Sequence, residues 1–144
     1  MTEQPDSEAV KALKRFYAAE EAYVVSGAKD FSVIAETLHE DVVMHQAVSL
    51  PYGGDWKGRE GIAAWIKAMN SVWSKLEHRD VRIFDAGQDT VFTRARAIVT
   101  SRANDQRFEF PILHQVTIED GKVVKAEPFY WDTAALLDFV RRAE

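Results

Sequence analysis

Glu20 and His114 are ionisable side chains at positions where the sequence pattern predicts an apolar residue, and both could exchange protons. Glu20 lies in the apolar arc of a predicted N-terminal helix, beside Phe16 and Tyr17. An unpaired carboxylate there needs a partner, a bound proton or a water-filled space. Alternatively, the helix is only partly covered and Glu20 reaches solvent past its neighbours.

Two histidines occupy comparable positions on predicted strands. His114 falls on the apolar side of an alternating segment, between Ile112 and Val116. It is either a hydrogen-bonded core residue or a polar anchor in a cavity that titrates near neutrality. His45 shares one side of an earlier strand with Val43 and Ala47, while Val42, Met44, Gln46 and Val48 form the other side. The alternation does not decide which side faces inward.

Asp132 precedes the last predicted helix and has two possible roles. Its carboxylate can cap the helix by accepting from the first free N–H groups. It can also serve as a general acid or base at the rim of a cavity, although a capping position normally lowers the pKa of a carboxyl.

The surrounding pattern predicts helices first and strands afterwards. A helix begins at Pro5–Ser7 and ends near Gly27, a short one covers 31–38, a strand covers 42–50, and Gly58 opens a third helix. Strands follow at 78–86, 90–101, 107–118 and 122–131, with turns at 86–89, 104–105 and 119–121, before a final helix after Asp132. This order predicts an α+β fold with helices on one face of an antiparallel sheet.

The composition of the chain limits which classes of partner and location are expected. The 144 residues predict one domain, 1–144. A net charge of -5 disfavours nucleic acid and anionic membranes as partners. No apolar run spans a bilayer, the acidic N-terminus lacks the features of a secretory signal, and there is no cysteine, so a cytoplasmic location is expected. No phosphate loop, nucleophile motif or metal-ligand spacing occurs, and so neither a metal nor an organic cofactor is predicted.

One side of the strand at 90–101 has an unusual mixture of residues. Arg94, Arg96 and Arg102 share it with Phe92 and Ile98, opposite a side of small and β-branched residues. The small residues suit a crowded concave face. The arginine side is therefore predicted to be the outer face, either half-solvated or in a subunit interface.

Five phrases, in this order and spacing, resemble the nuclear transport factor 2-like superfamily, in particular its SnoaL-like members. They are Gly27–Asp30, Leu38–Val43, Gly58–Ile62, Glu119–Val123 and Tyr130–Leu136. The resemblance implies a cone-shaped fold in which a curved antiparallel sheet wraps around the helices and leaves an internal pocket. It also implies homodimers that pair through the outer face of the sheet.

The superfamily includes ketosteroid isomerases, polyketide cyclases, limonene epoxide hydrolases and domains that only bind. The catalytic residues of the hydrolases fall near Ala95, Ala97 and Phe129 here, and those of the isomerases near Glu20 and Gln46 or Ala47. None of these sets is preserved. The resemblance favours an inward His45, beside Glu20 and His114, with Tyr17, Trp65, Phe110, Phe129 and Trp131 as pocket wall. Tyr52 and Trp56 would form an apolar lid made flexible by Gly53 and Gly54.

Two functions remain open from the sequence. The first is a cofactor-independent acid–base enzyme, of isomerase, cyclase or hydrolase/hydratase type, acting on a small hydrophobic polyketide-, steroid- or terpene-like molecule. His45, Glu20, His114 and Asp132 are its candidate catalytic residues. The second is a ligand-binding or dimerisation domain without chemistry.

Overall fold

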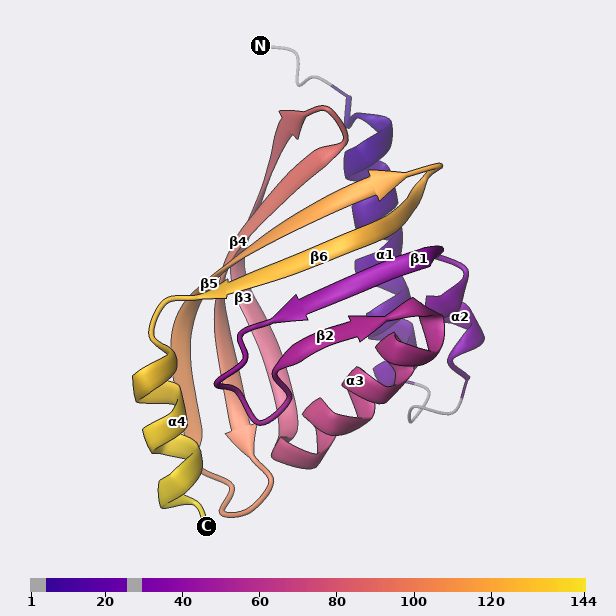
Figure 1. Cartoon of the computed structure of the whole chain (residues 1–144). Helices are drawn as coiled ribbons and strands as arrows, with labels where there is room; N and C mark the ends of the chain where they lie inside the picture. The colour runs from indigo at the N-terminus through magenta and orange to yellow at the C-terminus, as the bar shows by residue number, and fades with distance from the viewer. Residues whose placement is uncertain (1–4, 26–29) are drawn as a thin grey trace.

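The computed structural model describes residues 5–25 and 30–144, which form four helices and six strands (Figure 1). The helices are α1 (Glu8–Val25), α2 (Ser32–Ala35), α3 (Gly58–Val72) and α4 (Thr133–Arg142). The strands are β1 (Leu38–Gln46), β2 (Gly54–Lys57), β3 (Trp73–Gly87), β4 (Thr90–Ser101), β5 (Arg107–Glu119) and β6 (Lys122–Tyr130).

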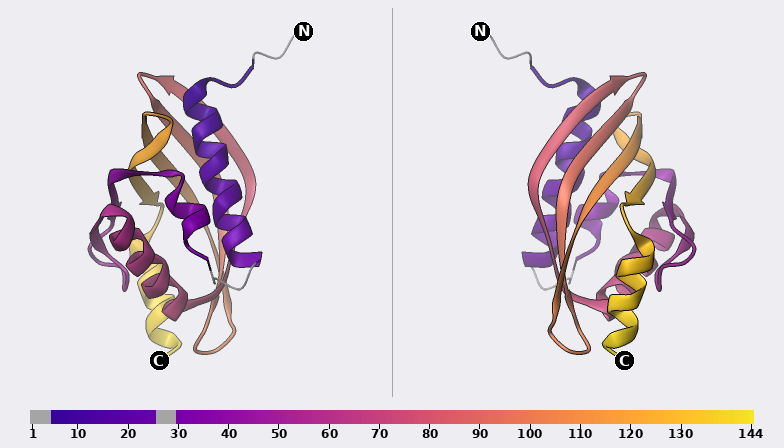
Figure 2. Two further views of the ribbon diagram at one scale, coloured as in Figure 1. Left: turned by 90° about the vertical axis from the view of Figure 1, so that its right-hand side faces the viewer. Right: turned by 90° about the vertical axis from the view of Figure 1, so that its left-hand side faces the viewer.

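All six strands belong to one sheet with the order β2-β1-β6-β5-β4-β3. The strands from β3 to β6 form an antiparallel meander, and β1 joins β6 in parallel, so the sheet is mixed. The predicted α+β fold is confirmed, with helices packed against a curved sheet. Figure 2 shows the long strands bowing around α1.

Alternation along the strands defines an inner face on which the core is built. On β4 the residues Val91, Thr93, Ala95, Ala97 and Val99 are buried, and on β5 the buried set is Phe110, Ile112, Val116 and Ile118. α1 contributes Leu13 and Phe16 to the same core, and α3 contributes Ile62, Trp65 and Ile66. The helices therefore cover the inner face, and the arginine side of β4 lies outward, as predicted.

α4 closes one end of this core. Its Phe139 ring stacks on Phe108 of β5 at 5.1 Å and on Trp73 of β3 at 6.2 Å between ring centroids. Leu136 is fully buried beneath it. The three residues predicted as the packing face of this helix, Leu136, Phe139 and Val140, belong to the core or pack against it.

The boundaries differ most around the second helix and the first strand. β1 starts at Leu38, inside the predicted helix 31–38, because the chain there already pairs with β6. Part of the predicted lid loop is β2, which pairs antiparallel with β1 from Val43–Lys57 to Gln46–Gly54. Within the described ranges, no helix combines the length and the apolar composition that a membrane crossing requires.

The predicted lid is wrong. Tyr52 is 1% exposed and lies in the core, and Trp56 donates from Nε1 to the Tyr52 carbonyl at 3.1 Å. A Cβ on Gly53 would clash with the backbone carbonyl of Ala47. Gly53 therefore permits a close backbone approach rather than flexibility, and the segment between β1 and β2 is a tight, packed turn.

The sharp turns follow the predicted turn chemistry. Asp120 and Gly121 have φ angles of 52° and 73°, and Asp89 and Asp105 also have left-handed backbones. Ser7 Oγ accepts from the backbone N–H of Val10 at 3.2 Å, which confirms the predicted start of the first helix. The predicted helix end at Gly27 lies outside the described residues.

β3 is a 15-residue strand at one edge of the sheet, and it is exposed along most of its length. Its pairing with β4 shifts by one residue between Arg79 and Arg82. Asp80 lies in this bulge with a φ of 54°, a left-handed backbone. The bulge lies two residues after His78, which stays exposed although its register partner, Ala97, belongs to the inner face.

Candidate active site

The strongest concentration of polar groups on the inner face lies between α1 and the middle of the sheet. The Tyr17 hydroxyl donates to Thr93 Oγ1 at 2.8 Å, and it lies 3.4 Å from His114 Nδ1. Thr93 and His114 are direct register partners on β4 and β5. Glu20, one turn after Tyr17 on α1, and His78 of β3 complete what we call the inner polar cluster.

Glu20 is the least conventional member of the cluster. In the described part of the chain its carboxyl has neither a hydrogen-bond nor an ion-pair partner. The side chain is surrounded by protein and keeps only a small accessible surface. Burial raises its pKa to about 7, so the carboxyl can hold or release a proton near neutral pH. Glu20 shares the helix face of Leu13 and Phe16 but is only half-buried, a position between the two alternatives left open by the sequence.

The other members of the cluster are neutral at the same pH. Burial lowers the pKa of His114 to about 4, with a smaller contribution from His78. Burial also raises the pKa of Tyr17 to about 12, and the Glu20 charge adds to this increase. The cluster thus combines one carboxyl that titrates near neutrality with neutral imidazole and phenol groups that form hydrogen bonds.

His78 reaches the cluster from the exposed edge strand. Its ring lies edge-to-face on that of His114, with centroids 5.8 Å apart. Ala97, the register partner of His78, and Ala95 are small, which leaves room on the inner face of β4 for this contact. Partial burial against His114 lowers the pKa of His78. The ring contact therefore links His78 on the exposed edge strand β3 to the His114 imidazole on the inner face.

A second network lies toward the β1 end of the sheet, and we call it the tyrosine network. The Tyr52 and Tyr130 hydroxyls are 3.1 Å apart, and Trp73 Nε1 donates to the Tyr52 hydroxyl at 3.2 Å. The Gln46 amide donates to Tyr130. Burial is the main reason why the pKa of Tyr130 is raised well above its ordinary range. These phenols are structural hydrogen-bonding groups rather than proton donors at neutral pH.

His45 does not belong to either network, and its predicted inward orientation is wrong. The buried residues of β1 are Val42, Met44 and Gln46, so the opposite side of the strand carries His45. Its side chain is 35% exposed, and its Nδ1 lies 2.6 Å from Asp55 Oδ1 of the neighbouring β2. α3 packs on the Met44 side, and this packing fixes which side of β1 is inside.

Three other predicted site residues lie away from the inner polar cluster. Asp132 is exposed and accepts from the Ala135 N–H at 3.0 Å, which makes it the N-cap of α4. Phe129 and Trp131 are 51% and 80% exposed, so neither forms a wall of an internal pocket. β6 turns Tyr130 inward, and its neighbours at 129 and 131 consequently face outward.

Of the predicted wall, Trp65 and Phe110 are buried in the core, and Tyr17 joins the cluster. Thr93, His78 and Gln46 were not predicted as site residues. Gln46 could have been found by its alternation with Val42 and Met44 once the inner side of β1 was known. His78 carries no comparable signal, because it lies on an exposed edge strand next to the bulge at Asp80.

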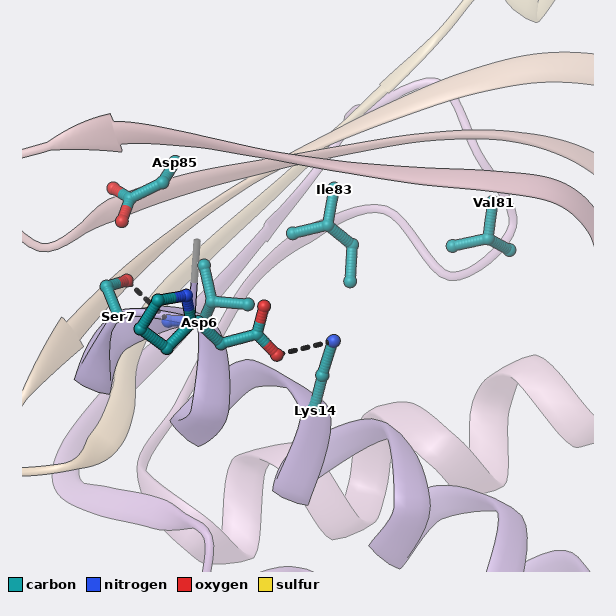
Figure 3. A pocket seen from close by; sticks show the side chains of 8 residues that line it. Asp6, Ser7, Lys14, Val81, Ile83 and Asp85 are labelled. Carbon is teal, nitrogen blue, oxygen red and sulfur yellow. Dashed lines mark hydrogen bonds and ion pairs between the residues drawn. The ribbon is translucent and has the colours of Figure 1, made fainter. Parts of the chain in front are cut away.

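A surface groove of about 560 Å³ opens between the start of α1 and β3 (Figure 3). Val10, Val81 and Ile83 form its apolar part, and an ion pair of 2.6 Å between Lys14 and Asp6 lies along it. Ile83 pairs with Thr93 on β4, which is the one register contact between the groove lining and the inner polar cluster among the described residues. None of the residues predicted to line a pocket lies in this groove.

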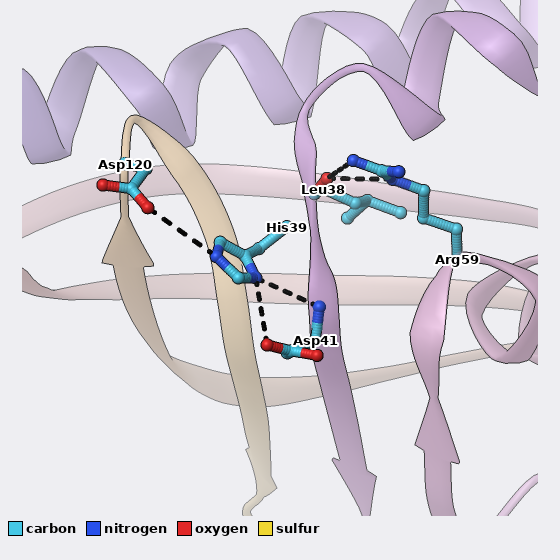
Figure 4. A network of polar contacts seen from close by, with 5 residues as sticks. All are labelled: Leu38, His39, Asp41, Arg59 and Asp120. Atoms are coloured by element: carbon cyan, nitrogen blue, oxygen red, sulfur yellow. Dashed lines mark hydrogen bonds and ion pairs between the residues drawn. The ribbon is translucent and has the colours of Figure 1, made fainter.

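A cluster of possible metal ligands lies at the turn between β5 and β6, formed by His39, Glu119 and Asp120. Figure 4 shows His39 between Asp41 and Asp120. His39 Nδ1 accepts from the backbone N–H of Asp41 at 3.0 Å. A neutral ring then carries its proton on Nε2, which faces Asp120 at 3.8 Å. The nitrogen that points at the carboxylates is therefore a donor and not a free metal ligand.

Comparison with solved structures identifies the fold. A chain of TerC co-crystallised with polyporic acid has 22% identity and a TM-score of 0.79, covering 94% of this chain and 99% of that one. An NTF2-like protein of unknown function from Burkholderia pseudomallei has 18% identity and a TM-score of 0.80, with 94% and 98% covered. A provisionally assigned polyketide cyclase from Pseudomonas putida has 20% identity and a TM-score of 0.71, also with 94% and 98% covered.

Among curated proteins, none matches the chain. The model of the SnoaL-like domain, however, matches residues 13–126, which include the inner face of the sheet and the cluster upon it. The predicted resemblance is thus confirmed, and the chain belongs to the SnoaL-like domain family, with the NTF2-like fold.

Proposed function

We propose that this protein is a cofactor-independent acid–base enzyme that acts on a small, largely apolar molecule at the inner polar cluster. The observation that carries the proposal is the unpaired Glu20 carboxyl one turn along α1 from Tyr17, whose hydroxyl lies 3.4 Å from Nδ1 of the neutral His114 ring. A carboxyl that titrates near pH 7 can both remove and return a proton, which isomerisation, ring closure and hydration all require.

In this proposal the members of the inner polar cluster have different roles in the reaction. Glu20 accepts a proton from a carbon or a water and returns it later in the reaction. Tyr17, whose hydroxyl is held by Thr93, and neutral His114 hydrogen-bond to the oxygen on which negative charge develops. The groove between α1 and β3 supplies an approach for the substrate. Compared with the expectation from sequence, the proton-transfer role moves from His45 to Glu20.

We infer the substrate class from the residues that surround the inner polar cluster and from the similar solved structures. The lining of the inner face is apolar, as a polyketide-, steroid- or terpene-like molecule requires. The similar structures include one co-crystallised with polyporic acid and a provisionally assigned polyketide cyclase. Polyporic acid and a panel of enones, lactones and epoxides are therefore the compounds to test first.

The experiment is a comparison of turnover by the wild type and Glu20→Gln, with Glu21→Gln and His45→Ala as controls. Glu21 is the exposed neighbour of Glu20 on the same helix. We expect Glu20→Gln to lower kcat by about 100-fold or more, the usual contribution of a proton-transferring side chain, and the controls to retain activity. Full activity of Glu20→Gln, or a Glu20 pKa near 4.5 by NMR titration, would remove the proposal.

The outer face of the sheet supports a second proposal, that the protein pairs with another copy of itself. Phe84 and Phe129 are 44% and 51% exposed on this face. Arg94 lies in the same row as Phe129, because both pair with Leu113, and Phe84 pairs with Phe92, two residues before Arg94. Within the described residues, Arg94 has neither a hydrogen bond nor an ion pair. Exposed aromatic residues around an arginine are typical of interface centres.

Sedimentation velocity tests this pairing at micromolar concentration. The wild type should sediment as a dimer, and Phe129→Glu should sediment as a monomer with an unchanged circular dichroism spectrum. A control substitution of similar chemistry, Val48→Glu, changes an 87% exposed residue in the turn after β1. A monomeric wild type, or a dimer that survives Phe129→Glu, would contradict the proposal. A pairing domain without chemistry would dimerise and show no Glu20-dependent turnover.

A further inference from the structure

The surface groove between α1 and β3 exposes side chains on the face of the sheet that elsewhere forms the core. Ile83 of β3 pairs with Thr93 of β4, which is buried on the inner face. Asp85, two residues further, pairs with Val91, which is fully buried. Val81, which lines the groove beside Ile83, is 48% exposed. Apolar surface of the inner face therefore stays accessible at this edge of the sheet.

Asp85 is a charged residue on the inner side of β3, and Figure 3 shows it at the end of the groove opposite to Val81. Its Oδ1 accepts from the backbone N–H of Gly87 at 2.9 Å. Hydrogen bonds from the Ser7 side chain and from the Gly87 N–H lower the pKa of its carboxyl, so the group is ionised at neutral pH. Over the ranges 5–25 and 30–144, no lysine or arginine forms an ion pair with this carboxylate.

The other two charged residues of the groove neutralise each other. Lys14 Nζ lies 2.6 Å from Asp6 Oδ2. The lining therefore has one uncompensated negative charge, that of Asp85, beside an apolar patch to which Val81 and Ile83 contribute. A ligand that complements this distribution has a positive charge at one end of an apolar body.

The dimensions of the groove suit a small molecule. Its volume of about 560 Å³ lies within the range of about 300 to 1,000 Å³ that is typical of small-molecule sites. Val81 and Asp85 are four residues apart along β3, which corresponds to at most about 13 Å. One or two fused rings on the apolar patch, joined by a short chain to the charged group, fit within this length.

We infer that the groove binds a small apolar amine, with its ammonium group at Asp85 and its apolar body on Val81 and Ile83. An ammonium group offers three N–H donors, and its hydrogen bonds to a carboxylate are stronger than those between neutral groups. The inference does not depend on the proposed function. The groove lining and the inner polar cluster have no residue in common, so an amine can bind here whether or not Glu20 transfers protons.

The binding experiment uses a matched pair of probes, tryptamine and tryptophol, in calorimetric titrations of the full chain at low ionic strength. The two probes have the same ring and the same two-carbon chain, and they differ in an amine or a hydroxyl at its end. We expect the wild type to bind tryptamine about five-fold more tightly, the effect of a partly exposed ion pair. The preference should shrink in high salt, which screens such a pair.

Three variants place the probes on the protein. Asp85→Asn removes the charge and keeps an oxygen that can accept from Gly87, so it should abolish the preference and leave the affinity for tryptophol unchanged. Asp105→Asn is the matched control, because it changes the net charge equally at an exposed turn between β4 and β5, and it should bind as the wild type does. Val81→Ser removes apolar surface from the groove and should weaken the binding of both probes by a similar factor.

Four results would overturn the inference. They are equal affinities of the wild type for the two probes, a preference that survives Asp85→Asn, an equal loss of preference in Asp105→Asn, and unchanged affinities in Val81→Ser. Glu20→Gln separates the inference from the proposed function. It should bind tryptamine as the wild type does, even where it removes turnover. Loss of tryptamine binding in Glu20→Gln would place the amine at the inner polar cluster instead of the groove.

Discussion

The Tyr17 hydroxyl lies 3.4 Å from Nδ1 of His114, so the N-terminal helix and the fifth strand of the sheet meet through two neutral, hydrogen-bonding side chains. Thr93 holds the phenol from the adjacent strand. Glu20 lies one turn after Tyr17 on the same helix, and its carboxyl has no ion-pair partner among the described residues. This arrangement leaves a carboxyl protonated near neutrality without abolishing its ability to ionise.

The raised pKa of Glu20 predicts a characteristic dependence of stability on pH. Between about pH 4.5 and 7 the folded state keeps the Glu20 proton while the unfolded state has lost it, so stability falls as pH rises. Glu20→Gln should remove this loss and raise the unfolding free energy at pH 8 by about 1 to 3 kcal/mol, with little change at pH 4. Urea denaturation at both pH values measures it, and Glu21→Gln should show neither effect.

His114 should act in the opposite sense over much of the same range. Its pKa is lowered to about 4 in the folded protein, so from about pH 4 to 6.5 the unfolded chain binds more protons and stability rises with pH. The two groups offset each other in the wild type. We expect Glu20→Gln to unmask a rising limb between pH 4.5 and 6.5, and the double variant Glu20→Gln/His114→Gln to lose it. If stability still rises with pH in the double variant, the rise comes from other titrating groups.

The bond between Tyr17 and Thr93 should contribute measurably to stability. Tyr17→Phe and Thr93→Val are each expected to destabilise the protein by about 1 kcal/mol, since each removes one partner of a part-buried hydrogen bond. Because the two variants remove the same bond, the double variant should cost less than the sum of the single ones. Additive effects in the thermodynamic cycle would show that the two groups are not coupled.

Asp132 is expected to behave as a helix cap. Asp132→Ala should lower the unfolding free energy by about 0.5 to 2 kcal/mol, because the Ala135 N–H loses its acceptor. Asp132→Asn should restore most of the stability. Neither substitution should alter turnover, and a folded Asp132→Asn without turnover would return this residue to the catalytic site.

We expect the turn before β2 to tolerate few substitutions at Gly53. Gly53→Ala places a methyl group against the Ala47 carbonyl and the Val48 backbone, and neither can retract independently. We expect a loss of about 2 kcal/mol or more, as for other overpacked positions. Gly54→Ala meets no atom within 4 Å and should cost less, although its φ of 103° is strained for alanine. Equal thermal shifts for the two variants would contradict this assignment.

The sequence predicts strands and helices well where apolar residues recur regularly along one side of the element. The alternation around His114 and the small residues at Ala95 and Ala97 correctly gave the inner face of the middle strands. β1 was different, because apolar residues occupy both of its sides, and only the packing of α3 selects the side of Met44. The misplacement of His45 follows directly from this ambiguity.

The site was predictable only in part, for a related physical reason. Glu20 stood out because a carboxylate in an apolar arc breaks a pattern. Gln46 and Thr93 break the pattern less, since an amide or a hydroxyl is common on a strand. His78 could not be found, because it lies beside a bulge that alternation does not reveal.

That bulge at Asp80 also bears on the behaviour of the protein at high concentration. β3 runs for 15 residues along one edge of the sheet, and the backbone groups on its unpaired side form a row on which strands of other molecules could assemble. The left-handed residue interrupts this row near its middle and kinks it away from a straight template. The same irregularity that separates His78 from the second half of the strand thereby shortens the straight stretch on which a foreign strand could pair.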